Sequence, residues 1–468
     1  MRHHVLIPLI VACALFMENM DSTVLATSLP AIAADIGENP LALKLALTSY
    51  LVGLAIFIPI SGWVADRYGS RKIFAWAIVV FLGGSLFCAA SSSLTLFVLA
   101  RFIQGIGGAM MVPVGRLVLL KSVPRSQLVS ALNYLTFPAL LGPIMGPPLG
   151  GLITQYFNWR GIFLINVPIS LLGIYLVLKH IPNIKEDALP PLDIRGFVML
   201  GLGLSLSMLG LSVLGGHLLP PIVTAACIVI GSVFLFAYYR HAKRAANPVI
   251  NLEVMKYPTF RAGVVGGSLF RIGAGASPFL LPLMFQLGFG LDPFHSGVLT
   301  CTSAIGAMFM KTLTLMILKR YGFRQVLIVN AILSSAGIAI YGLFTAQTPV
   351  SIIVPILILT GLLRSLQFTA IGAIGFAEIG KEFMSQASSL QSMTQRLAQS
   401  VGVVVGAYAL ELSSVLQHHA SIVASDFWPA FLVVGLIAGS SVFSNIALAP
   451  NAGAEMAGKG EKKDTTIV

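Results

Sequence analysis

Acidic and basic side chains interrupt several apolar runs of this chain, where charge is costly. The first run carries Glu18 and Asp21, which are three residues apart and therefore lie on one face of a helix. A later run carries Arg101 and Arg116, whose separation of fifteen residues corresponds to about 60° around a helix, so they also share a face. A charge at mid-bilayer costs about 2.5–3.5 kcal/mol on insertion scales, so each should have a partner or a function.

The chemistry that fits acids opposite guanidinium groups in a membrane is proton transfer. We predict that Asp21 and Glu18 carry the proton and that Arg101 is the cation that keeps them ionised until protonation releases it. The alternative is a static buried pair that braces two helices. The second part of the chain adds further embedded or nearly embedded charges: Arg271, Lys311, Arg364, Arg396 and Glu411.

The helices that must position these groups follow from composition. Of 468 residues, 56% are apolar and 10% are charged, with a mean hydropathy of +0.90. Soluble domains carry about a quarter charged residues, so lipid must be the solvent for most of this chain. Runs long enough to span a bilayer are predicted near 5–30, 43–62, 73–92, 95–120, 130–155, 161–180, 195–215, 220–239, 261–288, 296–318, 325–345, 349–376, 388–412 and 427–447.

The net charge of +12 is explained by topology rather than by nucleic-acid binding. With the N-terminus inside, the outer loops hold only Lys44 and Arg160, and about 21 basic residues collect on the inner side. The positive-inside rule then predicts a multi-pass protein of the bacterial inner membrane with both termini cytoplasmic. The four cysteines are far apart within apolar runs and predict neither a disulfide set nor a metal site.

An internal repeat organises the spans. The segment Arg67–Arg71 recurs as Arg320–Arg324, 253 residues later, and in both places it follows the second helix of a six-helix set. We therefore predict an all-α membrane protein with an N-terminal six-helix bundle (1–182) and a C-terminal one (246–448). Two additional helices with their linkers (183–245) lie between them, and a disordered cytoplasmic tail (449–468) follows.

Five motifs in the first 170 residues are specific. They are MDSTVLATSLP at 20–30, GWVADRYGSRK at 62–72, RFIQGIGG at 101–108, GPIMGPPLGG at 142–151 and WRGIFLINVP at 159–168. Their order and content resemble the major facilitator superfamily, in particular its branch of fourteen-helix drug/proton antiporters. The chain departs from that branch at Ala26, where an asparagine is usual, and in the second repeat loop, which lacks the counterpart of Asp66.

The resemblance implies a central cavity lined by the first, fourth, seventh and tenth core helices. Glu18, Asp21, Arg101, Arg116, Arg271 and Arg364 fall on those helices, and neighbouring helices add Lys311, Arg396 and a stripe of Gln391, Gln395 and Gln399. Arginine forks recognise carboxylates bidentately, so an anionic solute such as a carboxylate metabolite or a siderophore-like chelator is favoured. The expected substrate cavity comprises Arg116, Gln104, Arg271, Lys311, Arg364, Gln367, Gln395 and Arg396.

Two loop and helix motifs are expected to serve the conformational cycle. Around the first inner loop, charges can pair with one another or with helix ends and form a latch that opens in another state; its residues are Gly62, Asp66, Arg67, Gly69 and Arg71. In the fifth span, glycine and proline permit close packing and a bend, and the resemblance makes this an antiporter motif: Gly142, Pro143, Gly146, Pro147, Gly150 and Gly151.

The sequence thus favours a proton-coupled antiporter that exports small organic solutes by alternating access, without a cofactor, as a monomer among membrane lipids. A broad multidrug exporter and a substrate-specific importer of the same fold remain alternatives. An ATP-driven pump is disfavoured, because the near match to a phosphate loop at 453–460 lacks its Ser/Thr and any preceding strand. No nucleophile or metal cluster predicts an enzyme, and no selectivity ring predicts a channel.

Overall fold

The computed structural model describes residues 3–122, 128–186, 189–214, 218–380, 383–419 and 421–456. Within these ranges it is built of helices and contains no strand. The first six-helix set comprises α1 (His3–Ile36), α2 (Lys44–Tyr68), α3 (Ser70–Ala90), α4 (Leu94–Ser122), α5 (Leu128–Tyr156), and α6 (Gly161–Leu164) with α7 (Asn166–His180). Apolar chain in lipid must satisfy its backbone internally, and continuous helices do so.

The second set follows an intervening pair, α8 (Ile194–Val213) and α9 (Pro221–Ala242). It comprises α10 (Pro258–Leu283), α11 (Pro293–Tyr321), α12 (Phe323–Tyr341), α13 (Val350–Ile374), α14 (Met384–Leu416) and α15 (Phe427–Ile446). Short single-turn helices lie at Pro40–Leu43, Leu252–Lys256, Met284–Gly288 and Ala424–Asp426. Thirteen helices in the described residues are long and apolar enough to cross a membrane. The 29-residue α5 is not among the thirteen but occupies the predicted span 130–155.

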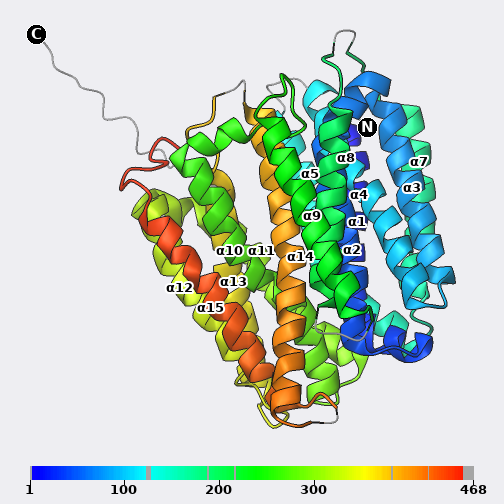
Figure 1. The fold of residues 1–468 in the computed structure, drawn as a ribbon, viewed down its shortest axis with the longest axis vertical. Coiled ribbons are helices and arrows are strands. Elements are labelled where there is room, and N and C mark those ends of the chain that lie inside the picture. The colour runs from blue at the N-terminus through cyan, green and yellow to red at the C-terminus, as the bar shows by residue number, and fades with distance from the viewer. Residues whose placement is uncertain are drawn as a thin grey trace, which may run out of the picture.

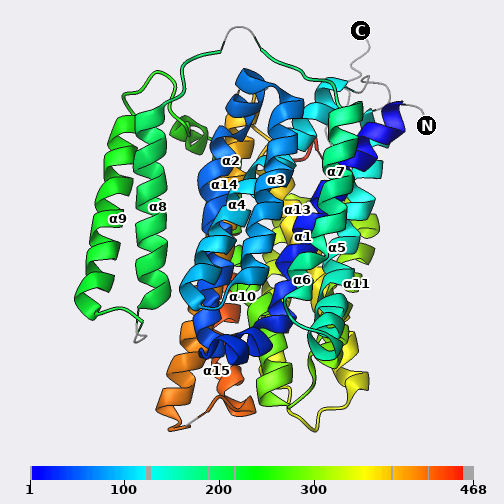
Figure 2. The same cartoon turned by 90° about the vertical axis from the view of Figure 1, so that its right-hand side faces the viewer.

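The ends of the predicted spans agree with those of the observed helices to within about six residues, the largest differences being at the ends of α1 and α2, and the all-α membrane fold is confirmed. We call the end of the bundle at which α1 begins and α15 finishes the proximal end, and the opposite end the distal end. Figure 1 shows the second set, with α10, α12, α13 and α15, on one side and the first set, with α3 and α7, on the other. Figure 2 shows α8 and α9 standing together at one flank of the bundle.

The sequence repeat corresponds to a repeated turn. Gly69, between α2 and α3, has φ +102°, and Gly322, between α11 and α12, has φ +81°. Only glycine adopts such backbone angles without strain, which explains why Arg-Tyr-Gly occurs at both places. The structure therefore builds the same tight corner in each set.

Helix packing defines the two halves and the seam between them. Within the first half α5 packs on α1, and within the second α14 packs on α10. Across the seam α5 packs on α11 and α14 on α2. The pair α8–α9 contacts mainly α2, through Phe57 against Phe197 of α8. The Trp63 indole of α2 also donates to the carbonyl of Pro190, in the segment before α8.

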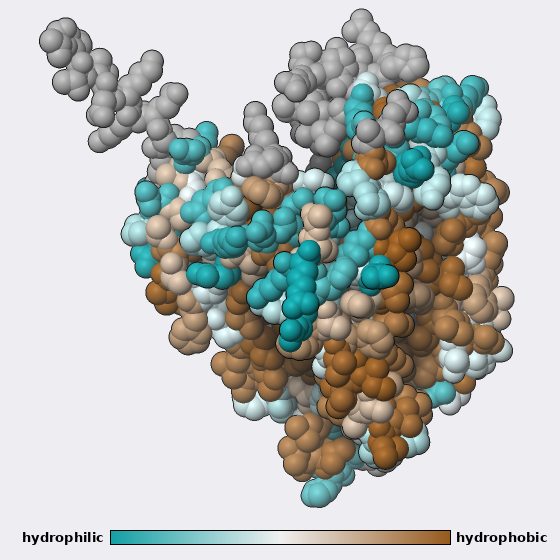
Figure 3. Space-filling view, turned by 45° about the horizontal axis from the view of Figure 1, so that its top comes forward, coloured by the Kyte–Doolittle hydropathy of each residue, from teal (hydrophilic) through white to brown (hydrophobic). Residues whose placement is uncertain are grey.

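The surface follows the membrane environment. Figure 3 brings the proximal end forward and shows hydrophilic side chains gathered there, with hydrophobic side chains on the flanks below. In the predicted tail, residues 449–456 form hydrogen-bonded turns, and the residues after 456 lie outside the described ranges.

Candidate functional site

A buried charge network lies at mid-height of the first half. The Asp21 carboxylate on α1 accepts a hydrogen bond from Arg101 Nη1 on α4, with an N–O distance of 2.6 Å. The other Asp21 oxygen accepts from Gln104 Nε2 at 2.8 Å and from Asn166 Nδ2 at 3.0 Å. Both amides also donate to Ser85 Oγ on α3, and Arg101 Nη1 donates to Gln104 Oε1 as well.

This network neutralises its own charge. Arg101 is fully buried and lies over the Tyr50 ring, with 4.4 Å from its guanidinium carbon to the ring centroid. Its Nε and Nη2 have no hydrogen-bond partner among the described residues. The predicted pairing of Asp21 with Arg101 is thus present, and a proton added to Asp21 would leave Arg101 as an unpaired buried cation.

Glu18 has a different partner from the one the sequence suggested. Its carboxylate accepts from Arg396 Nη2 on α14 at 2.9 Å, so the ion pair joins the two halves. Glu18 is 2% exposed, whereas Arg396 lines a cavity. Glu18 therefore connects the first-half acid pair to the second-half charges, rather than sharing Arg101 with Asp21.

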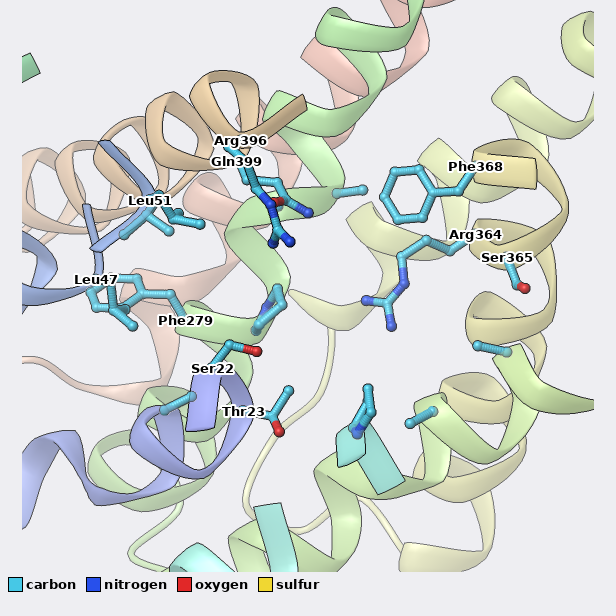
Figure 4. A pocket seen from close by; sticks show the side chains of 18 of the residues that line it. Ser22, Thr23, Leu47, Leu51, Phe279, Arg364, Ser365, Phe368, Arg396 and Gln399 are labelled. Atoms are coloured by element: carbon cyan, nitrogen blue, oxygen red, sulfur yellow. The ribbon is translucent and has the colours of Figure 1, made fainter. Parts of the chain in front are cut away.

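The cavity lies between the halves and has a volume of about 360 Å³. Figure 4 shows Arg364 from α13 and Arg396 from α14 extending into it, with Ser22 and Thr23 of α1 opposite. Its walls are mostly apolar, and include Leu47, Leu51, Phe279, Phe368 and Val403.

In the part of the chain that the structure describes, the charged residues that line this cavity are all basic: Arg101, Lys311, Arg364 and Arg396. Arg101 and Arg396 are paired with acids that do not line it. Lys311 donates to Thr369 Oγ1 at 2.9 Å, and Arg364 donates to Ser303 Oγ at 3.4 Å. Neither forms an ion pair within the described part of the chain, so the cavity has a net positive charge.

Several other predicted cavity residues lie elsewhere. Gln104 and Gln367 are fully buried in hydrogen bonds between helices, the latter with Asn330 Nδ2 at 2.8 Å. Arg271 is buried behind the cavity wall. Arg116 and Gln395 are not among the lining residues, although Arg116 still acts electrostatically on Glu18. Sequence gives the helix that carries a residue but not the rotation of that helix against its neighbours.

The proximal loop of the first half forms an ion cluster, but not with the partners expected. Lys121 Nζ, at the end of α4, donates to Asp66 at 2.9 Å and to Glu186 at 2.7 Å. Burial alone would lower the pKa of Lys121, but the hydrogen bonds that it donates to Glu186 and Asp66 outweigh burial and raise that pKa above its usual value.

Gly69 admits the segment after α7 into this cluster, because a Cβ there would collide with the Asn183 side chain. Gly62, by contrast, faces open space. Arg67 is exposed, and neither it nor Arg71 has an ion pair in the described residues.

The glycines of α5 are contact points. A Cβ at Gly142 or Gly146 would lie 2.9 or 2.0 Å from atoms of α1, and one at Gly150 would lie 2.5 Å from the Val24 carbonyl. Gly151 faces the other half, where a Cβ would lie 2.2 Å from the Pro293 carbonyl of α11. The expected close packing of this motif is therefore present on two faces of one helix.

Sequence reasoning did not assign roles to Asn166, Ser85, Tyr50 and Phe368. Asn166 lies in the motif at 159–168 and is an amide inside an apolar run, which is a usable signal. Ser85, Tyr50 and Phe368 are ordinary in membrane helices and give no such signal.

Comparison with known proteins places the chain. The family model described as Major Facilitator Superfamily matches residues 11–403. The multidrug resistance protein MdtD of Pectobacterium carotovorum is 38% identical over 86% of this chain and 87% of its own length. The MdtD protein of Klebsiella pneumoniae is 36% identical over 90% of this chain and 89% of its own length.

The fold agrees as well. A solved D-xylose-proton symporter superposes with a TM-score of 0.67 at 14% identity, covering 96% of this chain and 98% of that one. The chain therefore belongs to the Major Facilitator Superfamily and is a multi-pass membrane transporter rather than an enzyme.

Proposed function

We propose that the chain is a proton-coupled antiporter that exports small organic anions, such as carboxylate metabolites or siderophore-like chelators, from the cytoplasm. The observation that carries the proposal is the cavity whose charged lining residues are all basic, two of them without an acidic partner in the described part of the chain. Guanidinium and ammonium groups beside a low-dielectric wall attract carboxylates strongly.

Orientation follows from charge. The proximal end carries basic residues from many loops, among them Arg67, Lys72, Lys121, Arg240 and Lys243. The positive-inside rule assigns this end to the cytoplasm of a bacterial inner membrane, and hence both termini as well.

The same orientation supports an inward-facing state. Polar contacts that join the halves include Gln286 with the Thr27 carbonyl, Phe294 with Gln155, and Lys44 with Glu411, all toward the distal end. Glycine packing of α5 against α11 closes the same end. The cavity then loads substrate from the cytoplasm.

Asp21 is the proposed proton carrier, with Glu18 as a second acid. The Asp21 carboxylate accepts hydrogen bonds from Arg101 and two amides, and its protonation frees a cation that borders the cavity. Such an exchange couples occupancy of the cavity to proton binding without any cofactor, so the proton gradient alone drives transport. The transporter acts as a monomer on a small-molecule substrate in contact with lipid, and does not bind nucleic acid.

A broad multidrug exporter is the second candidate. It is favoured by the names of the relatives and by the apolar walls of the cavity. In this case Lys311 and Arg364 are structural, and lipophilic cations are carried.

One experiment separates the two. Purified protein is reconstituted in vesicles, and movement of a labelled tricarboxylate driven by a pH gradient is compared with movement of a cationic dye. Antiport of anions predicts gradient-dependent tricarboxylate flux that Arg364→Ala removes, with no dye flux. Dye flux that survives Arg364→Ala, without tricarboxylate flux, would establish the multidrug candidate instead.

A further inference from the structure

Arg271, on α10, is the buried cation that the proposed mechanism does not use. It is 2% exposed, its Nε has no hydrogen-bond partner, and it forms no ion pair within the described residues. A buried charge without an acid is costly, and such groups in membrane proteins usually serve a ligand or a conformational change.

The position of Arg271 on α10 directs it toward the cavity. Gly275 and Pro278 line the cavity, and Arg271 precedes Gly275 by one helical turn, on the same face. Its guanidinium instead lies back along its own helix, where a Cβ at Gly267 would come within 2.6 Å of Arg271 Nη1. Glycine at 267 thus makes the space in which the cation is held.

Phe368 separates Arg271 from the cavity. The guanidinium carbon of Arg271 lies 5.9 Å from the centroid of the Phe368 ring, and Phe368 itself lines the cavity. Figure 4 shows Phe368 beside Arg364, one turn away on α13. Rotation of this ring would therefore bring Arg271 into the same space as Arg364.

We propose that Arg271 is a second anion-binding subsite of the central cavity, screened by Phe368 and uncovered when that ring turns aside. The inference rests on the proposed function, since it assigns Arg271 to a second anionic group of the same substrate. The group is a carboxylate, phosphate or sulfonate, all of which a guanidinium binds through paired hydrogen bonds. A substrate with one anionic group needs Arg364 alone, whereas one with several also engages Arg271.

Chemical labelling tests whether Phe368 screens Arg271, and it does so without knowledge of the substrate. Full-length protein in vesicles is treated with the arginine reagent phenylglyoxal, and adducts are quantified by peptide mass spectrometry. Phe368→Ala should raise labelling of Arg271 about tenfold while Arg364, already open to the cavity, changes little. Phe279→Leu, which alters another ring of the cavity wall, is the matched control and should leave Arg271 protected.

Transport tests the subsite itself. Arg271→Gln should lower flux of a tricarboxylate about tenfold and leave flux of a monocarboxylate nearly unchanged, with partial recovery in Arg271→Lys. Equal loss for both anions, or no additional Arg271 label in Phe368→Ala, would overturn the subsite. Failure of the wild type to move either anion would instead overturn the proposed function, and the labelling result would still stand on its own.

Discussion

The two halves of the molecule treat charge in opposite ways. In the first half, Asp21 and Arg101 neutralise each other and are enclosed by amides and a hydroxyl group. In the second half, Arg271, Lys311 and Arg364 have no acidic partner in the described part of the chain. Glu18 and Arg271 are even separated by the same 253 residues as the repeated loops, so an acid in one half corresponds to a base in the other.

This difference suggests a division of labour. A closed acid–base network binds a proton by releasing its own cation, whereas unpaired cations need a counter-ion from outside. The first half is then the proton-binding half and the second the substrate-binding half, with Glu18–Arg396 as the connection between them.

The largest expected effect is from Asp21→Asn, which removes the proton site of the first half. Proton-driven flux should fall at least about 100-fold, because no other group in the network takes up a proton next to Arg101. The measurement compares gradient-driven flux in vesicles with substrate exchange in the absence of a gradient. Asp35→Asn, which breaks the distal Asp35–Arg160 pair, is the matched control and should retain coupling. Unchanged proton coupling in Asp21→Asn would contradict the assignment of proton binding to the first half.

Arg364→Gln tests the other half. Loss of an unpaired cavity cation should weaken anion binding about tenfold or more, as measured by equilibrium binding of a labelled tricarboxylate to the purified protein. Arg116→Gln removes an arginine that does not line the cavity and should alter binding much less. Equal losses in the two variants would show a general effect of positive charge rather than a binding site.

Gly151→Val tests the seam where the halves meet. A Cβ at Gly151 would lie 2.2 Å from a backbone carbonyl of α11, so the larger side chain should destabilise the distal-closed state by about 1–3 kcal/mol. The change is measured as the reactivity of a cysteine at the distal end with thiol reagents and as the thermal stability of the protein. Gly62→Ala, which points into open space, should be silent in both assays.

Lys121→Met gives the smallest effect, because the Asp66–Lys121–Glu186 cluster is partly exposed. The expected loss is about 0.2–1 kcal/mol, diminished further by salt. The pKa of Lys121 is raised in the folded state, so the contribution is complete below its usual value of 10.5 and is lost as pH rises through the higher folded value. The melting temperatures at neutral pH and above pH 10.5 should therefore differ for the wild type. The difference between these two temperatures should be smaller for the variant.

Sequence predicted the helices far better than the contacts between them. Span limits follow from local hydrophobicity, and the Asp21–Arg101 partnership followed from two rare charges on helices expected to face one another. The partner of Glu18 and the burial of Arg271 depend on how helices from different halves are rotated and spaced. The hydrogen bond between Gln104 and Ser85 beside Asp21 was equally out of reach, since these two side chains acquire their role only where three helices converge.

The glycine contacts of α5 affect the rate of the conformational change. Gly142, Gly146 and Gly150 meet α1 through its backbone and through the short side chains of Asn19, Thr23 and Thr27, and Gly151 meets the backbone of α11. Contacts of this kind contain no long interdigitated side chains that must separate, and only short side chains have to adjust when the helices shift. The activation barrier between inward- and outward-facing arrangements should therefore be low along α5, and substitutions at these glycines should slow turnover more than they weaken substrate affinity.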